Sequence, residues 1–278
     1  MAPHRHPFRS RAAVATSLLA VTALTTGLLG LAPLATAPAQ TQEASPKPPV
    51  STVPVPRTDG AAERQTEVLR RVREAKGPAS VVFVGDSITQ GWEGAGKVAW
   101  DRAFAPLGAI NIGVSGDRTE HVLWRLAEAP LTALDPKAIV VMIGTNNLGH
   151  GSSNAEETLL GVQAIVSTLH TQCPSARIVL CGIFPRGERF NGMRGDICQI
   201  NQTLQRLAGD AVIVRDFGHR FLKDDGSIST DIMPDHLHLS QAGYAIWAEE
   251  MLPLLTRITN AGGAKEEHQR NADVPAKR

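Results

Sequence analysis

The stretch Val81-Val82-Phe83-Val84-Gly85-Asp86-Ser87 decides the fold class of this chain. Its first four residues are apolar without polar alternation, which is typical of a strand buried on both faces of a parallel sheet. Three further runs have the same character, residues 138–143, 178–180 and 212–214, and residues 109–112, which contain Asn111, are a weaker fifth strand. Apolar residues with helical spacing fill the gaps, at about residues 61–76, 118–128, 154–171, 195–208 and 240–258. This alternation predicts a three-layer α/β protein, in which a five-stranded parallel sheet carries helices on both faces.

The composition excludes several classes of protein. Of the 278 residues, 42% are hydrophobic and 20% are charged, so the chain can bury a core and is not largely disordered. Lys and Arg number 28 against 27 Asp and Glu, and without a basic excess nucleic acid is not an expected partner. Three cysteines are too few for a disulfide scaffold or a zinc module, and we expect neither a metal nor another cofactor.

Residues 1–39 have the organisation of a secretory signal peptide. Arg5, Arg9 and Arg11 precede an uncharged stretch rich in Ala and Leu, which contains the small-x-small pattern Ala37-Pro38-Ala39. Cleavage there predicts an exported protein, periplasmic or extracellular, with no membrane span in the mature chain. The alternative is an uncleaved membrane anchor, because residues 12–35 are long enough to cross a bilayer.

Two further boundaries follow from the composition. Residues 40–60 are rich in proline and predict an extended, solvated linker. Residues 260–278 lack apolar periodicity and predict a disordered tail. We therefore expect a single domain over residues 61–259.

Polar residues follow the first three predicted strands at the point where ligands bind in parallel sheets. Ser87 follows the first strand at a strand-to-helix turn, which exposes a serine hydroxyl. Gly116 follows the second strand, just before a helix, where its N–H can donate to an oxyanion. Asn146 follows the third strand, and its side-chain amide can supply another donor. Each of these residues alone is also common in ordinary turns.

Two Asp-His pairs can each supply the base of a hydrolytic site. Asp235 and His238 are three residues apart, and so are Asp216 and His219. In either pair the carboxylate can hold one imidazole nitrogen while the other faces a serine. The spacing alone does not separate the pairs. A metal bound by His236 and His238 is a third reading, but two histidines with one carboxylate are too few ligands to favour it.

Four blocks together resemble the SGNH (GDSL-type) hydrolase superfamily. They are Gly85-Asp86-Ser87, the run 111–117, the run 140–147 and the run 235–239. Within the superfamily, these blocks, with residues 121–126 and 185–188, look like the catalytic subunits of intracellular platelet-activating-factor acetylhydrolases. The resemblance covers roughly residues 80–255. It implies a flavodoxin-like three-layer fold, no cofactor and a homodimer.

The resemblance also implies a role for each motif residue. Ser87 is the expected nucleophile, His238 the base and Asp235 the residue that orients it, which favours this pair over Asp216 and His219. The Ser87 N–H, the Gly116 N–H and the Asn146 amide are the expected oxyanion hole. Ser115 stands where the subfamily usually has glycine, and the apparent export signal is absent from the namesake enzymes, so their substrate does not carry over.

The expected activity is that of a secreted serine esterase acting on a small-molecule or glycan ester. No long apolar insertion is present to act as a lid, which favours short acyl groups, acetyl first. Trp92 and Leu148 are candidates to line the acyl pocket, and plain core packing is the alternative for both. The alternatives for the activity are an acyltransferase acting on a glycan, a lysophospholipase or thioesterase-type hydrolase, and a non-catalytic binding protein.

Three local predictions complete the analysis. Asp117 and Glu120 have the spacing of a capping box at the start of the second helix. Arg186, after the fourth strand, is expected to brace a loop rather than neutralise an acidic group. Cys181 and Cys198 are the cysteines most able to form a disulfide, with free thiols as the alternative.

Overall fold

A five-stranded sheet lies at the centre of the structure, with the strand order β2-β1-β3-β4-β5 and every neighbouring pair parallel. The computed structural model describes residues 47–75 and 77–272, with side chains as far as residue 261. The strands are β1 (Val81–Gly85), β2 (Ala109–Asn111), β3 (Ala138–Met142), β4 (Arg177–Cys181) and β5 (Val212–Arg215). All five lie at the predicted runs, so the parallel sheet is confirmed.

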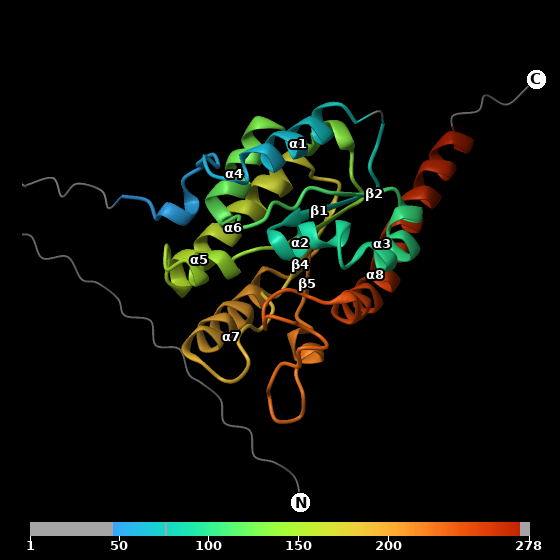
Figure 1. The fold of residues 1–278 in the computed structure, drawn as a ribbon. Coiled ribbons are helices and arrows are strands. Elements are labelled where there is room, and N and C mark those ends of the chain that lie inside the picture. Colours follow the sequence, from blue (N-terminus) through green and yellow to red (C-terminus); the bar gives the residue numbers. More distant parts are fainter. Residues whose placement is uncertain (1–46, 76, 273–278) are drawn as a thin grey trace, which may run out of the picture. The chain divides into compact units, whose positions relative to one another are not determined.

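Helices cover both faces of this sheet, which confirms the three-layer α/β architecture (Figure 1). One face carries α1 (Ala62–Arg73), α4 (Thr119–Glu128), α6 (Ala155–Gln172) and α7 (Gly192–Leu204), and the other carries α3 (Lys97–Ala103) and α8 (Gln241–Ala272). The short helices α2 (Ser87–Gln90) and α5 (Thr145–Gly149) directly follow β1 and β3. The sequence did not predict α2, α3 and α5, because four to seven residues are too few to show apolar periodicity.

The alternation of side chains along the strands explains the continuous apolar runs. Val82 and Val84 pack into the core beneath α1, α4 and α6, whereas Val81 and Phe83 pack into the core beneath α3 and α8. Because successive side chains point to opposite faces of a strand, both sets must be apolar when both faces are covered. The continuous apolar runs in the sequence therefore reflect the burial of both faces of the sheet.

The predicted linker over residues 40–60 is wrong for the part that the structure describes. Residues 47–59, called here the N-terminal strap, lie against α4 and α6 (Figure 1). Ser51 is fully buried, donates its hydroxyl hydrogen to the Glu157 carbonyl and accepts a hydrogen bond on its own carbonyl from Thr119. The Val55 N–H donates to the Glu120 carbonyl. The proline-rich composition predicted a solvated segment, but Ser51, Val55 and Arg57 each form backbone hydrogen bonds to the domain, which composition cannot reveal.

The C-terminal helix is longer than predicted. It continues from Gln241 to Ala272, so the predicted tail begins with helical residues. Ala, Lys, Glu and Gln, which dominate residues 264–269, are all strong helix formers, and helix formation there does not need an apolar face. Residues 273–278 and the predicted signal peptide, residues 1–39, lie outside the described residues. Within the described part of the chain, no helix is both long enough and apolar enough to span a membrane.

The predicted capping box at the start of α4 is also wrong. The Asp117 carboxylate is fully buried and pairs with the guanidinium groups of Arg125 and Arg57. Glu120 pairs with Arg118 through its carboxylate and does not cap the helix. The cap is a hydrogen bond from the Arg118 N–H to His121 Nδ1, 3.0 Å. Arginine partners outside the capping-box pattern, Arg57 and Arg125 for Asp117 and Arg118 for Glu120, therefore engage both carboxylates.

The cysteines are free thiols, so no disulfide joins Cys181 to Cys198. Cys181 is buried in the core beneath α8, where burial raises its pKa to about 12. Cys198 is exposed on α7. The two thiols therefore lie in different environments. The alternative prediction, that the cysteines are free thiols, is confirmed.

We predict that Arg125→Met will destabilise the fold strongly. Arg125 is buried, pairs with Asp117 and donates to the Ile112 carbonyl at 3.1 Å, so its removal leaves a buried carboxylate with one partner fewer. Breaking a buried ion pair from one side costs about 3–5 kcal/mol. Urea unfolding measures the loss. Arg70→Ala, which removes only exposed pairs on α1, is the control and should change the midpoint little; equal midpoints for the two variants would contradict the prediction.

Candidate active site

Ser87 lies at the turn between β1 and α2. It is the first residue of α2, and the preceding Asp86 caps that helix by accepting a hydrogen bond from the Ile88 N–H at 2.9 Å. Glycine is needed at position 85 because a Cβ there would clash with the Met142 carbonyl oxygen on the neighbouring strand β3. The serine hydroxyl is therefore presented at the carboxyl edge of the sheet, as the sequence predicted.

A chain of hydrogen bonds joins Ser87 to His238 and Asp235. Ser87 Oγ lies 2.9 Å from His238 Nε2, and His238 Nδ1 lies 2.6 Å from Asp235 Oδ2. The other carboxylate oxygen, Oδ1, accepts from the backbone N–H of His238 at 2.7 Å and of Leu237 at 3.1 Å. With Nδ1–H donated to the carboxylate, Nε2 is left to accept the serine proton.

The other Asp-His pair lies elsewhere. Asp216 and His219 are exposed beside the end of β5, where Asp216 accepts a hydrogen bond from the Gly218 N–H. Within the described residues, no hydrogen bond or ion pair joins Asp216 or His219 to Ser87 or His238. Of the two pairs that the spacing left open, the structure brings only Asp235 and His238 to the serine.

Three groups at the same edge can donate hydrogen bonds to an oxyanion. The backbone N–H groups of Ser87 and Gly116 have no acceptor within the described part of the chain. Asn146 is buried at the start of α5, and its amide nitrogen donates one hydrogen to the Asp117 carbonyl at 2.9 Å, which leaves the second hydrogen for a ligand. Gly116 adopts φ +74°, a conformation that other residues rarely adopt, so glycine is needed there.

Side chains from two other elements support the Gly116 loop (residues 113–117), and no sequence pattern predicted either of them. Gln90 at the end of α2 accepts a hydrogen bond from the Ser115 N–H at 2.8 Å. Arg64 on α1 donates from Nε to the Gly113 carbonyl at 3.1 Å. Neither side chain belongs to a motif, and each contact spans more than 20 residues, so no local signal in the sequence marks them.

Asp86 and Asp235 are two carboxyl groups in contrasting electrostatic environments. Asp86 is fully buried, and burial raises its pKa to about 7, against the opposing effect of the Ile88 hydrogen bond. Burial also opposes ionisation of Asp235, but the hydrogen bonds from His238 outweigh it, so the pKa of Asp235 lies below its ordinary value. At neutral pH, Asp235 is therefore an anion that can stabilise a protonated imidazole.

Arg186 braces the loop after β3, in agreement with the sequence-based expectation. Its Nη1 atom donates to the carbonyl and hydroxyl oxygens of Thr145 at 3.0 and 3.1 Å. A Cβ on Gly149 would lie 2.4 Å from the same atom, so the guanidinium packs directly against α5. The contact fixes the helical turn that carries Asn146.

The expectation that Trp92 and Leu148 line an acyl pocket is not met. Trp92 has no exposed surface and packs with Phe104 and Trp247, with ring centroids 5.2 and 5.0 Å away. Leu148 is buried in the core on the other face of the sheet. Large apolar side chains close to a motif in the sequence can still point into the core, and both of these do.

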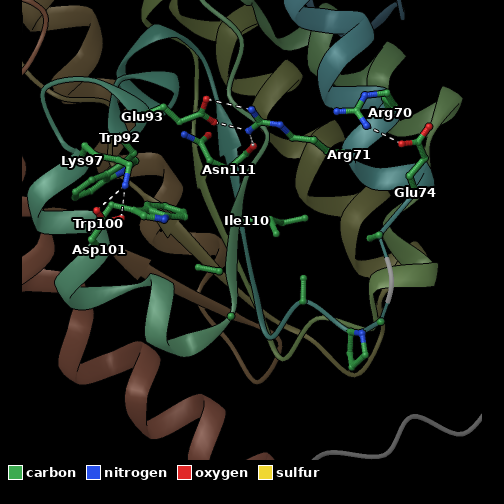
Figure 2. Close-up of a pocket in the computed structure, with 16 residues that line it drawn as sticks. Arg70, Arg71, Glu74, Trp92, Glu93, Lys97, Trp100, Asp101, Ile110 and Asn111 are labelled. Carbon is green, nitrogen blue, oxygen red and sulfur yellow. Dashed lines mark hydrogen bonds and ion pairs between the residues drawn. The ribbon is translucent and has the colours of Figure 1, made fainter.

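A hollow of about 650 Å³ lies beside β2 (Figure 2). Trp100 forms part of its wall, and the ion pairs Arg71–Glu93 and Lys97–Asp101 lie at its edge. Ser87, His238 and Asn146 are not among the residues that line it. The hydrogen-bonded serine lies instead at an open surface, where the side chains of His238 and Asp235 are 46% and 54% exposed.

The chain matches a known protein family and curated relatives. Residues 83–246 match the model of the GDSL-like lipase/acylhydrolase family. Over 182 residues the chain is 42% identical to the human platelet-activating factor acetylhydrolase IB subunit alpha2, which covers 64% of this chain and 76% of that subunit. Identity to the human subunit alpha1 is 40% over 180 residues, with the same coverage of both chains.

Solved structures agree on the fold. A Bacteroides fragilis protein provisionally described as an acylhydrolase superposes with a TM-score of 0.62 at 18% identity, over 73% of this chain and all of that one. A GDSL-like lipase from Bacteroides thetaiotaomicron gives 0.56 at 18% identity, over 70% of this chain and 95% of its own. The matched motifs, the identity to acetylhydrolase subunits and the shared fold lead to one conclusion: this chain is a hydrolase that belongs to the GDSL-like lipase/acylhydrolase family.

Proposed function

We propose that this chain is an exported serine esterase that removes short acyl groups, acetyl first, from ester substrates. The observation that carries the proposal is the continuous hydrogen-bond chain from Ser87 Oγ through His238 to the Asp235 carboxylate. A serine held by an imidazole that is itself held by a carboxylate is the arrangement that activates a hydroxyl for acyl transfer.

In this mechanism His238 takes the hydroxyl proton of Ser87 as the oxygen attacks the ester carbonyl. The tetrahedral oxyanion receives hydrogen bonds from the Ser87 and Gly116 N–H groups and the Asn146 amide. Its collapse expels the alcohol, which takes the proton from His238, and leaves an acyl-serine. Water then gives a proton to His238 as its oxygen attacks the acyl carbonyl. The second tetrahedral intermediate collapses by breaking the bond between the carbonyl carbon and Ser87 Oγ, His238 returns the proton to Oγ, and the acid leaves. Asp235 stays ionised and stabilises the imidazolium.

Two observations support the substrate class. The curated relatives are named as acetylhydrolase subunits. The half-exposed His238 and Asp235 make the alcohol side accessible, so a bulky alcohol such as a glycan can approach. Export rests on the signal-peptide pattern of residues 1–39.

We predict that p-nitrophenyl ester hydrolysis peaks at acetyl and falls with acyl length. Ser87→Ala and His238→Ala should each lose at least about a thousandfold in kcat, because each removes a part of the activation chain. His219→Ala is the matched control, since it removes the histidine of the other Asp-His pair, and it should keep wild-type activity.

The same panel discriminates the alternatives. A folded wild-type protein that is inactive on every acyl length overturns the esterase proposal. Activity that appears only when a sugar acceptor is added identifies a glycan acyltransferase. A maximum at long acyl chains instead identifies a lysophospholipase or thioesterase-type enzyme.

Asn146→Ala should lower kcat by about 10²–10³-fold and change KM little, because the amide stabilises negative charge that develops only after attack. Steady-state kinetics on p-nitrophenyl acetate measures both parameters. A rise in KM at unchanged kcat would show that the amide binds the ground state instead.

The contribution of Asp86 to the stability of the protein should fall as the pH rises from about 4 to about 7. Its folded pKa of about 7 lies above its unfolded value, so within this window the folded chain keeps a proton that the unfolded chain has lost. The slope from this group is at most about 1.4 kcal/mol per pH unit. Asp86→Asn keeps the Oδ1 acceptor for Ile88 and should gain stability relative to wild type as the pH rises through the window. Parallel stability curves, measured by urea unfolding at each pH, contradict this.

A further inference from the structure

We propose that Arg57, on the N-terminal strap, is a positioning residue of the active site that holds the Gly116 loop in its oxyanion-binding shape. The inference rests on the proposed function, because it concerns the donor role of the Gly116 N–H. Arg57 lies 59 residues before Gly116 in the chain and outside the residues that match the family model, which begin at residue 83.

The Arg57 guanidinium forms hydrogen bonds with the loop on both sides of Gly116. Its Nη1 atom donates to the Ser115 carbonyl at 2.8 Å and to the Asp117 carboxylate at 3.0 Å. A Cβ on Gly116 would lie 3.1 Å from Nη2 and 3.2 Å from Nη1, so the planar guanidinium also packs directly against the glycine. These contacts restrict rotation of the Gly116 peptide group.

The guanidinium is itself held in place. Asp59 accepts hydrogen bonds from Nε at 2.9 Å and from Nη2 at 2.6 Å, and the pairing with Arg57 lowers the pKa of Asp59 to about 2. The side chain of Arg57 is only 10% exposed. Its backbone N–H donates to the Gln65 side chain at 3.0 Å, which fixes the strap to α1. A forked, pre-oriented donor of this kind is what arginine supplies and lysine does not.

Arg57 also reaches the second oxyanion donor through Asp117. The Asp117 carboxylate pairs with Arg57. The backbone carbonyl of Asp117 accepts the hydrogen bond that orients the Asn146 amide. A shift of Asp117 therefore disturbs Gly116 and Asn146 together. This coupling separates a positioning role from a purely structural one, because a purely structural contact would not link Arg57 to Asn146 in the kinetics.

The test compares Arg57→Ala, Arg57→Lys and Arg73→Ala in the full chain, with p-nitrophenyl acetate as the probe. Arg73 is the matched control: it is an arginine whose guanidinium donates to a distant backbone carbonyl, that of Glu128, away from the Gly116 loop. We expect kcat to fall about 10- to 100-fold in Arg57→Ala, less than for outright loss of a donor, with KM within about twofold. Arg57→Lys should be intermediate, and Arg73→Ala should equal wild type.

A double-mutant cycle and chemical rescue supply readouts that a structural role does not move. Arg57→Ala should cost less kcat in an Asn146→Ala background than in wild type, because both substitutions act on one oxyanion hole. Millimolar guanidinium, well below denaturing concentrations, should restore part of the kcat of Arg57→Ala and none of Arg73→Ala. Circular dichroism and urea unfolding report the folded fraction, to which each kcat is normalised.

Each outcome decides the proposal. A folded Arg57→Ala variant with kcat within twofold of wild type overturns it and leaves the esterase assignment intact. Additive effects of the two substitutions on kcat in the double-mutant cycle also overturn the proposal. So does a loss of stability in Arg57→Ala without a loss of normalised kcat, because Arg57 would then have only a structural role. If Arg57→Ala does not fold, Arg57→Lys carries the same comparison. A wild-type protein without esterase activity overturns the proposed function, and this inference with it.

Discussion

The buried carboxylate of Asp117 is the group on which the arrangement of the active site depends. This carboxylate has no exposed surface and forms ion pairs with Arg125 on α4 and with Arg57 on the strap. The backbone carbonyl of Asp117 accepts a hydrogen bond from the Asn146 side-chain amide. A buried carboxylate is costly unless its partners are in place, so folding must assemble all of them together. The Gly116 loop is thereby fixed by helix, strap and sheet before any substrate binds.

This preassembly suits the proposed chemistry. Donors that are already oriented towards a developing oxyanion do not have to reorganise during the reaction, which is the source of their effect. The acid–base half of the site is built differently, since Asp235 and His238 are three residues apart on one loop and that loop is tied to the rest by a hydrogen bond from the Gly187 N–H to the His236 carbonyl, 2.7 Å. Because Asp235 and His238 position each other, the pair can keep its geometry although both side chains are about half exposed.

The strap changes the view of where the catalytic unit begins. The family model starts at residue 83, and composition placed a linker before residue 61, yet Ser51 is fully buried and Arg57 reaches the Gly116 loop. The residues that match the family fix the reaction class. Residues 47–59 lie before them and still contribute to the geometry of the site.

The sequence by itself determined the sheet, the layers and the motif residues at the strand ends. Two-sided burial leaves continuous apolar runs such as residues 81–84, and parallel strands bring their carboxyl ends to one edge. Only the tertiary structure decided between the two Asp-His pairs on geometric grounds, since both have the same spacing and only His238 lies 2.9 Å from Ser87. It also placed Trp92 in the core and Arg57 against Gly116, because side-chain direction and contacts over more than 50 residues leave no local pattern.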